Sequence, residues 1–203
     1  MSQPVLPFGF PFDDPSLPYQ VVRMCADDVE KVMHIERKAF PSPWPASAYH
    51  YELTQNDLST YLVLKLRQVP PPGGRLRQAP SQQPILAYGG FWLIVDEAHI
   101  STIATHPDWR GRGLGEMMLA ALIDVAMLRG AVEATLEARV SNVVAQGLYR
   151  KYAFAVVGRR KGYYRDKNED ALIMTTPRLD SPDFTVRYAE LKMALRHRLA
   201  GTA

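Results

Sequence analysis

Three glycines occupy alternate positions in a segment that follows a predicted strand and precedes a predicted helix. The segment covers residues 103–116, and the glycines stand at 111, 113 and 115. Glycine admits left-handed backbone conformations and lets a ligand approach the backbone closely. Successive N–H groups in such a loop, together with the positive end of the helix dipole, form an anion site. Since Arg110 and Arg112 add positive charge, the segment is typical of a phosphate or pyrophosphate cradle.

Two nucleotide-binding motifs do not fit this segment. A Walker loop needs a Lys-Ser/Thr pair at the start of the helix, where this chain has Leu114-Gly115-Glu116. A dinucleotide fingerprint needs its third glycine at the position of Glu116 and its first glycine directly after the strand, whereas residues 106–110 intervene. At this point a tight structural turn without a ligand remains the alternative.

The spacing Arg110-x-x-Gly113-x-Gly115 matches the R/Q-x-x-G-x-G/A pattern of the GCN5-related N-acetyltransferases (GNAT), in their strand–loop–helix context. Further pieces that resemble this family follow in order: Leu136-Glu137, Ser141-Asn142, Gly147-Leu148-Tyr149 and Phe154. The resemblance covers about residues 19–177. It implies an α/β fold with one mixed, mostly antiparallel sheet flanked by helices, and it implies acetyl-CoA as the co-substrate.

At finer grain, the chain is similar to the bacterial acetyltransferases that modify the N-terminal alanine of a ribosomal protein. This similarity rests on Ala39-Phe40 with Trp44, and on the run from Arg160 to Met174. It implies acetyl transfer to a protein N-terminal amine, with a small-subunit ribosomal protein as the substrate. Two rivals stay open, namely the same fold acting on a lysine or a small-molecule amine, and a non-catalytic acyl-CoA-binding module.

The resemblance also implies roles for single residues. Glu137 is implied as the general base and Tyr149 as the general acid, the alternatives being a solvated glutamate at a strand end and a core tyrosine. Three aromatic residues are implied to face the peptide: Trp44, Tyr163 and Tyr164. The residues implied to contact the coenzyme are Ile103, Ala104 and Thr105 through its pantetheine arm, the loop residues Arg110, Gly111, Arg112, Gly113, Leu114, Gly115 and Glu116, and Asn142.

The spacing of the two proposed catalytic residues is compatible with these roles. Strand alternation places Glu133 and Glu137 on the same face of the predicted strand over 132–138, with Glu137 nearer its end. Tyr149 follows Asn142 by seven residues, so two helical turns bring both to one helix face. Asn142 can cap its helix and contact the coenzyme at the same time.

The chemistry of acyl transfer favours an α-amine as the acceptor. An α-amino group has a pKa of about 7.7–8.0, so roughly a sixth of it is neutral at pH 7. A lysine amine has a pKa of about 10.4, which makes its deprotonation about 3.5 kcal/mol more costly. A carboxylate that works through a water molecule can serve as the base for this step.

The elements that must position these residues can be predicted from periodicity and from glycine and proline positions. Strands alternate with helices in the second half of the chain and follow one another in the first half, which favours a mixed α/β arrangement around one sheet. We expect strands over residues 19–24, 60–66, 85–95, 99–105, 132–138, 154–160 and 170–176, with a turn at Asp96-Glu97. We expect helices over residues 27–39, 46–55, 114–129, 142–152 and 182–199, with Gly130 directly after the third of them.

Three segments are predicted to lie outside the family resemblance. A proline-rich irregular arm covers residues 1–18, and a proline-rich loop over 68–84 is an insertion in the acetyltransferase domain, which covers 19–177. An amphipathic helix lies in the extension over 178–203. We expect this helix to dock on the parent domain, rather than on a partner, through its apolar stripe of Phe184, Tyr188, Leu191, Leu195 and Leu199.

Composition excludes several classes of protein. The 203 residues are 47% hydrophobic and 22% charged, which rules out a disordered chain. The single cysteine, Cys25, rules out a disulfide scaffold, and we expect it to be reduced and buried. Five histidines show no zinc-binding spacing, so no metal is expected.

The charge and the apolar runs bear on partners and location. The formal net charge is +3, which suits an anionic small molecule, and without a nucleic-acid-binding motif no direct nucleic-acid contact is expected. No apolar run approaches the roughly 18 residues of a membrane span, so no membrane partner is expected. The first residues lack the pattern of a signal peptide, and we therefore expect a cytoplasmic protein.

Overall fold

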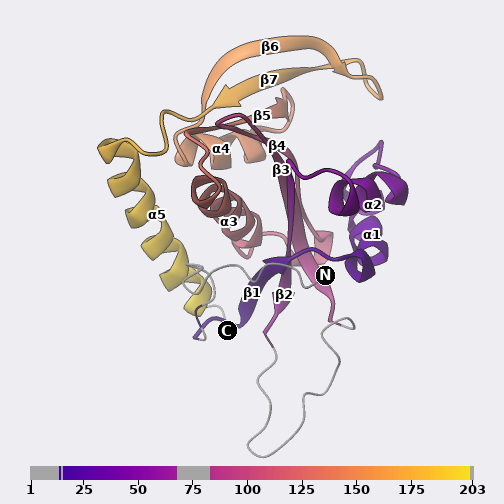
Figure 1. Ribbon diagram of the computed structural model, residues 1–203, viewed down its shortest axis with the longest axis horizontal. Helices are drawn as coiled ribbons and strands as arrows, with labels where there is room; N and C mark the ends of the chain where they lie inside the picture. The colour runs from indigo at the N-terminus through magenta and orange to yellow at the C-terminus, as the bar shows by residue number, and fades with distance from the viewer. Residues whose placement is uncertain (1–13, 15, 68–82, 202–203) are drawn as a thin grey trace, which may run out of the picture.

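The computed structural model describes residues 14, 16–67 and 83–201, which fold around one twisted sheet (Figure 1). Within these residues the sheet has seven strands in the order β1-β2-β3-β4-β5-β7-β6, and β4 with β5 is its parallel pair. The mostly antiparallel mixed sheet flanked by helices, predicted from the sequence, is confirmed. The strands are β1 Tyr19–Arg23, β2 Ser59–Leu66, β3 Ile85–Ile94, β4 Glu97–Thr105, β5 Glu133–Arg139, β6 Ala155–Tyr164 and β7 Glu169–Thr175.

The helices cover the two faces of the sheet unequally. In Figure 1, α1 and α2 lie on one face, while α3 and α5 lie on the other. The helices are α1 Val29–Ala39, α2 Ala46–Thr54, α3 Leu114–Leu128, α4 Val143–Lys151 and α5 Pro182–Ala200, with short 3₁₀ turns at Ala26–Asp28 and Pro107–Trp109. In the described part of the chain, no helix is long and apolar enough to cross a bilayer.

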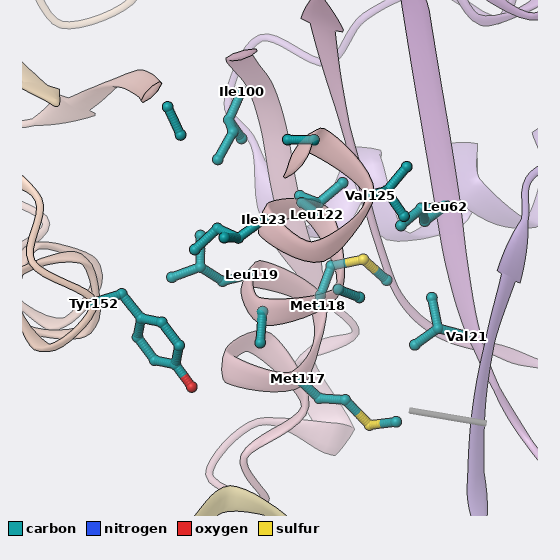
Figure 2. Close-up of a cluster of buried hydrophobic side chains, with 14 of the residues drawn as sticks. Val21, Leu62, Ile100, Met117, Met118, Leu119, Leu122, Ile123, Val125 and Tyr152 are labelled. Atoms are coloured by element: carbon teal, nitrogen blue, oxygen red, sulfur yellow. The ribbon is translucent and has the colours of Figure 1, made fainter. Parts of the chain in front are cut away.

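The larger hydrophobic core is centred on α3, which is buried along most of its length. Figure 2 shows its side chains Met118, Leu122 and Val125 beside residues from the sheet, among them Leu62 and Ile100. Such all-round burial fixes the helix and therefore fixes the loop at its N-terminus. A second cluster, including Val32, Ile35 and Tyr49, holds α1 and α2 on the opposite face.

The parallel pair β4–β5 is short, and this shapes the centre of the molecule. Its paired residues run from Glu97 and Glu133 to Ile100 and Leu136, and both strands continue beyond that point without pairing to each other. The β3–β4 register shifts directly after Ile100, so that Ser101 is an extra residue in β4. Because such a bulge bends its strand, the carboxyl ends of β4 and β5 diverge and leave a gap in the sheet.

Most predicted elements are confirmed within two residues at each end. The turn predicted at Asp96-Glu97 was one residue late: β3 ends at Ile94, and the turn residue Val95 has φ +60°. A β-branched residue rarely adopts that conformation, so a turn at Val95 could not be predicted from the residue type. Strand β6 differs as well, since it extends past the predicted end at residue 160 to Tyr164 and forms a long hairpin with β7.

Two smaller predictions concern Cys25 and the segments at the chain ends. Cys25 is half-buried, which corrects the expectation of burial: it precedes a 3₁₀ turn, and its thiol donates to Asp28 at 3.3 Å. The predicted arm over 1–18 lies outside the described residues except for 14 and 16–18, and the predicted loop over 68–84 lies outside them except for 83 and 84.

The predicted docking of the C-terminal helix is confirmed. In α5, Phe184, Tyr188, Leu195 and Leu199 are buried in the core around α3. The Tyr188 hydroxyl donates to the carbonyl oxygen of Ala120 at 2.7 Å, and Lys192 pairs with Asp124 at 2.8 Å. This helix is therefore part of the packed domain.

Candidate active site

A cavity of about 840 Å³ opens where β4 and β5 diverge. Its walls come from α1, from β3, from the ends of β4 and β5, from α4 and from the β6–β7 hairpin. The predicted site residues that line it are Trp44, Ile103, Glu137, Asn142, Tyr149, Tyr163 and Tyr164. One cavity thus brings together residues that are more than a hundred positions apart in the sequence.

Glu137 lies on β5 inside this cavity, with its side chain only 7% exposed. His99 on β4 donates from Nε2 to Glu137 Oε2 at 2.7 Å, and Arg160 Nη1 lies 3.2 Å from Oε1. The hydrogen bond from His99 lowers the pKa of Glu137, and the charges of His99 and Arg160 act in the same direction against the effect of burial. Glu137 is therefore held as a carboxylate, the form that can accept a proton.

Tyr149 lies on α4 and reaches the same cavity, with its ring 5.9 Å from that of Phe154. Burial raises the pKa of Tyr149 to about 12, so its hydroxyl carries its proton at neutral pH. Asn142 is the N-cap of the same helix, since its Oδ1 accepts from the N–H of Ala145 at 3.2 Å. The capping predicted for Asn142 is confirmed, while its contact with a coenzyme stays a prediction.

The glycine loop forms the turn into α3. Gly111 and Gly113 have φ of +77° and +80°, in the left-handed region that favours glycine. Gly113 is the N-cap of α3 and no side chain caps it, so the N–H groups of the first turn point out of the helix without an intrahelical partner. Arg110, Gly111 and Arg112 are exposed beside them. These features fit the pyrophosphate of an acyl-CoA.

Two side chains of the first turn of α3, those of Leu114 and Glu116, are held within the fold. Leu114 is buried in the core. The carboxylate of Glu116 accepts from Lys151 at 2.5 Å, from Arg198 at 2.6 Å and from Tyr152 at 3.0 Å, which together lower its pKa against burial. Its charge is therefore balanced by groups of α4, α5 and the turn between α4 and β6, so that the main-chain N–H of Glu116 is what the loop offers to an anion.

The strand that leads into the glycine loop supplies the predicted pantetheine-binding residues. Ile103, Ala104 and Thr105 form the end of β4 and pair with β3 on one side. On the side of β5, pairing stops at Ile100. The β5-facing edge of this part of β4 is therefore free of ladder hydrogen bonds and can bond an extended ligand.

Aromatic side chains form the wall of the cavity opposite the hairpin. Trp44, from the loop before α2, stacks on Trp92 of β3, with ring centroids 6.1 Å apart and planes at 17°. Trp92 in turn contacts His99, at 5.8 Å between centroids. The wall therefore leads from the α1–α2 side of the cavity to the His99–Glu137 pair.

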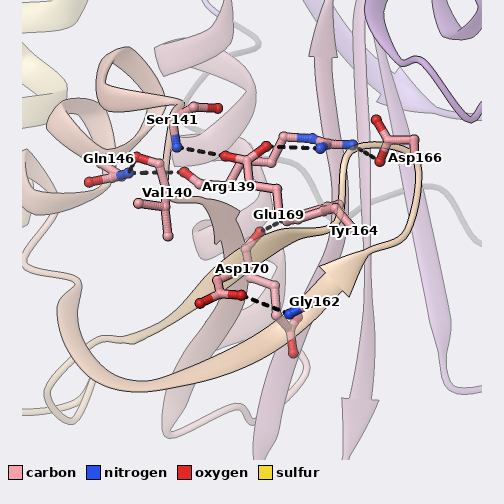
Figure 3. A network of polar contacts seen from close by, with 10 residues as sticks. Arg139, Val140, Ser141, Gln146, Gly162, Tyr164, Asp166, Glu169 and Asp170 are labelled. Carbon is pink, nitrogen blue, oxygen red and sulfur yellow. Dashed lines mark hydrogen bonds and ion pairs between the residues drawn. The ribbon is translucent and has the colours of Figure 1, made fainter.

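The β6–β7 hairpin closes the other side, and a polar network holds it (Figure 3). Arg139 of β5 pairs with Asp166 at 2.8 Å and with Glu169 at 3.0 Å. Ser141 donates to Glu169 and, together with Arg139, lowers the pKa of that carboxyl to about 2. The Tyr164 hydroxyl donates to the Glu137 carbonyl at 3.2 Å, and Tyr163 is 45% exposed at the cavity.

The sequence did not single out three residues that the structure brings to the site. They are His99 of β4, Trp92 of β3 and Glu36 of α1. Strand alternation relative to Glu137 could have indicated His99, but nothing in the sequence pairs β4 with β5. Among residues 14, 16–67 and 83–201, no group of three or more His, Cys, Asp or Glu could hold a metal ion.

Comparison with known proteins finds relatives that match the part of the chain that forms this cavity. Residues 29–154 match the model of the acetyltransferase (GNAT) family. A putative ribosomal protein bS18-alanine N-acetyltransferase of Bacillus subtilis is 36% identical over 154 residues, which cover 76% of this chain and 92% of that protein. The N-alpha-acetyltransferase RimI of Mycobacterium tuberculosis is 30% identical over 172 residues, covering 82% and 95%. The crystal structure of the ribosomal-protein-S18-alanine N-acetyltransferase of Escherichia coli superposes with a TM-score of 0.64 at 28% identity, covering 78% and 93%.

Proposed function

Because this chain belongs to the acetyltransferase (GNAT) family, we propose that it transfers the acetyl group of acetyl-CoA to the N-terminal amine of a protein. The acceptor we propose is the N-terminal alanine of ribosomal protein bS18, which the names of its Bacillus and Escherichia relatives specify. These relatives match along nearly their whole length.

One observation carries this proposal: the carboxylate of Glu137 and the phenol of Tyr149 line the same cavity. Glu137 has a lowered pKa and is ionised, whereas Tyr149 has a raised pKa and is protonated. Amide formation from an amine and a thioester needs a proton acceptor on the amine side and a proton donor on the thiolate side. The pair Glu137 and Tyr149 offers one of each.

The way in which the coenzyme binds is inferred from the backbone at the start of α3. The first-turn N–H groups after Gly113, with Arg110 and Arg112, bind the pyrophosphate, and the free edge of Ile103–Thr105 bonds the pantetheine arm. Bound acetyl-CoA supplies the thioester carbonyl that the amine attacks. Lys151 and Arg198 pair with the Glu116 carboxylate and balance its charge, so that it does not repel the phosphates.

On the acceptor side, Glu137 takes the proton from the attacking amine, directly or through a water molecule. His99 and Arg160 hold its carboxylate in place and keep it ionised. Tyr149 gives its proton to the departing thiolate. Trp44, Tyr163 and Tyr164 contact the first residues of the peptide, because they form the aromatic walls on either side of the cavity.

The test is a comparison of acceptors at fixed acetyl-CoA. Peptides that begin with Ala, Ser or Met are compared with a peptide whose N-terminus is blocked and which carries an internal lysine. We expect turnover of the Ala peptide to exceed that of the lysine peptide by at least about tenfold at pH 7, because the lysine amine is far more protonated. Preferred turnover of the lysine peptide would contradict the proposed acceptor. Absence of turnover on every amine would leave an acyl-CoA-binding module.

A further inference from the structure

A second carboxyl group lines the cavity and takes no part in the steps described above. Glu36 of α1 is 2% exposed and borders the cavity beside Phe40 and Trp44. Its Oε1 accepts a hydrogen bond from the Tyr49 hydroxyl. Its Oε2 is buried and has no hydrogen-bond partner among the residues that the structure describes. A buried carboxyl oxygen without a partner is costly, so it calls for an explanation.

The electrostatic surroundings of Glu36 differ from those of Glu137. Glu137 has the cation Arg160 at 3.2 Å and the imidazole of His99 at 2.7 Å. Within the described residues, Glu36 is paired with no cation. The polar groups around it are neutral: the hydroxyls of Tyr49 and Tyr88, which lie 3.5 Å apart, and the backbone N–H of Trp44. Burial raises the pKa of Glu36, whereas hydrogen bonding lowers that of Glu137.

Of the two carboxyls, Glu36 therefore gains more from a cation that enters the cavity. The charge of Glu137 is already balanced, while a cation beside Glu36 would remove the cost of an unpaired buried charge. The cation must reach Oε2. Glu36 lines the cavity, but this oxygen has almost no exposed surface, so binding requires a small rotation about the last, soft torsion of the side chain.

The neighbouring side chains specify which kind of cation fits. Phe40 and Trp44 line the cavity beside Glu36, and the Trp44 and Tyr49 rings lie 5.8 Å apart. Aromatic faces favour an ammonium group that carries a small apolar substituent. A metal ion would need further oxygen or nitrogen ligands, and the described residues hold no such group.

We propose that Glu36 binds the ammonium form of the acceptor amine through Oε2, with Tyr49 holding the other oxygen of the carboxyl from behind. The identity of the acceptor as a protein N-terminus rests on the function proposed above, whereas the ammonium subsite rests on Glu36 itself. The two carboxyls then have different roles. Glu36 binds the charged amine, and Glu137 removes its proton at the moment of attack.

The test compares binding of two peptides that differ in one group. One begins with alanine, and the other has the same sequence with a propanoyl group in place of the alanine, so that it lacks the amine. By calorimetry we expect the parent protein to bind the amine peptide about tenfold or more tightly, as a charged hydrogen bond implies. Glu36→Gln should bind both peptides alike, with acetyl-CoA affinity unchanged. Its KM for the Ala peptide should rise about tenfold while kcat stays within about threefold.

Glu52→Gln is the matched control. Glu52 is also a buried glutamate, on α2, and its Oε2 accepts from Trp92 at 2.8 Å and from Asn56 at 2.8 Å. A glutamine can accept the same bonds, so the amine preference should persist in this variant. A folded Glu36→Gln protein that keeps the preference would overturn the proposal, and so would loss of the preference in both variants.

A second arm separates this inference from the proposed function. Propylammonium is titrated against propanol, and the chemical shifts of the Trp44 and Trp92 indole N–H groups are followed in the parent and in Glu36→Gln. We expect shifts with propylammonium in the parent alone. If no peptide binds the parent but this pattern appears, the proposed acceptor fails and the ammonium subsite stands. If propylammonium produces the same shifts in both proteins, the subsite fails whatever the acceptor is.

Discussion

The two ends of the active site are built from different parts of the chain. Apart from Asn142, the proposed coenzyme end is one contiguous segment, residues 103–116, and it offers mainly backbone N–H groups at the start of α3. The acceptor end is assembled from side chains of α1, β3, β4, β5 and the β6–β7 hairpin, which meet only in the folded protein. A backbone anion site depends on local conformation, whereas a side-chain site depends on the geometry of the whole sheet.

This difference predicts how each end responds to substitution. At the coenzyme end, backbone conformation should matter most, and damage should appear as lower coenzyme affinity. At the acceptor end, changes of single atoms should alter kcat or the KM for the acceptor while coenzyme affinity is unchanged. The variants below test that division, beginning with the largest expected effect.

Glu137→Gln should have the largest effect, because it keeps the shape of the side chain and removes its basicity. We expect kcat to fall by about 10²- to 10⁴-fold at pH 7, with acetyl-CoA affinity unchanged by calorimetry. The loss should shrink as the pH rises towards the pKa of the acceptor amine, since more of the amine is then neutral without help. Rates between pH 7 and 9 measure this recovery.

Glu133→Gln serves as the control for that variant. Glu133 lies on the same strand, at the end away from the cavity, opposite Glu97. Its rate should equal that of the parent. Near-full activity of Glu137→Gln at pH 7 would remove Glu137 from the reaction and, with it, the idea that the acceptor end acts through single side-chain groups.

Tyr149→Phe should have the next largest effect, a fall in kcat of about 10²-fold, because the thiolate must then leave without a proton. The free energy of unfolding should barely change, since burial of the ring is retained. A core tyrosine would instead lose about 0.5–1.5 kcal/mol of stability with little change in rate. Urea unfolding together with single-turnover rates distinguishes the two.

A thioester with a more acidic thiol provides the control for Tyr149. Such a donor leaves without help, so it should restore part of the rate in Tyr149→Phe and change the parent much less. Parent and variant are therefore each measured with acetyl-CoA and with the activated donor. Equal rate ratios for the two donors would mean that Tyr149 does not protonate the leaving group.

At the coenzyme end, Gly113→Val should weaken acetyl-CoA binding by about tenfold or more, because valine is strained at a φ of +80°. Its Cβ would also lie within 3.6 Å of Leu195 and Leu199 of α5, which pack behind the loop. Gly130→Val is the control: φ is +91° there, no atom lies within 4 Å of the added Cβ, and the position is at the other end of α3. It should lose stability but keep coenzyme affinity. Equal affinities in both folded variants would remove the anion-cradle interpretation.

The same division explains how much of the site the sequence could predict. The glycine loop was recognisable because its glycines, arginines and helix start are neighbours in the chain, and the left-handed φ of Gly111 and Gly113 agrees with that reading. The helix over 114–129 and the C-terminal helix were predictable from their apolar periodicity. Glu137, Tyr149 and the aromatic residues were found only through resemblance to a family, and their roles stay predictions.

What the sequence could not predict depends on pairing between distant segments. His99 meets Glu137 because β4 lies beside β5 in a particular register, and no local pattern encodes that register. Glu36 follows Ile35 in an ordinary helix stripe, and only the fold shows that its carboxyl is buried at a cavity. Nor could the sequence show that Lys151 and Arg198 hold the Glu116 carboxylate against α4 and α5, which leaves its main-chain N–H for the predicted coenzyme contact.

The smallest expected effect concerns His99, and it tests whether pairing across the sheet tunes the base. The hydrogen bond from His99 is the main cause of the lowered pKa of Glu137, and burial opposes it. In His99→Phe that bond is gone and burial remains, so the pKa of Glu137 must rise.

A base acts only when it is ionised. As the pH falls, the variant should therefore lose kcat/KM at a higher pH than the parent does. Protonation of the acceptor amine affects both proteins equally, which leaves the variant-to-parent ratio as a report on Glu137 alone. We expect this ratio to be near one at pH 8 and to fall as the pH is lowered towards 5. His34→Phe is the control, because it replaces an imidazole that stacks on His106 and does not contact Glu137. Its ratio to the parent should stay flat over the whole pH range. A flat ratio for His99→Phe as well would mean that burial and Arg160 alone set the ionisation of Glu137.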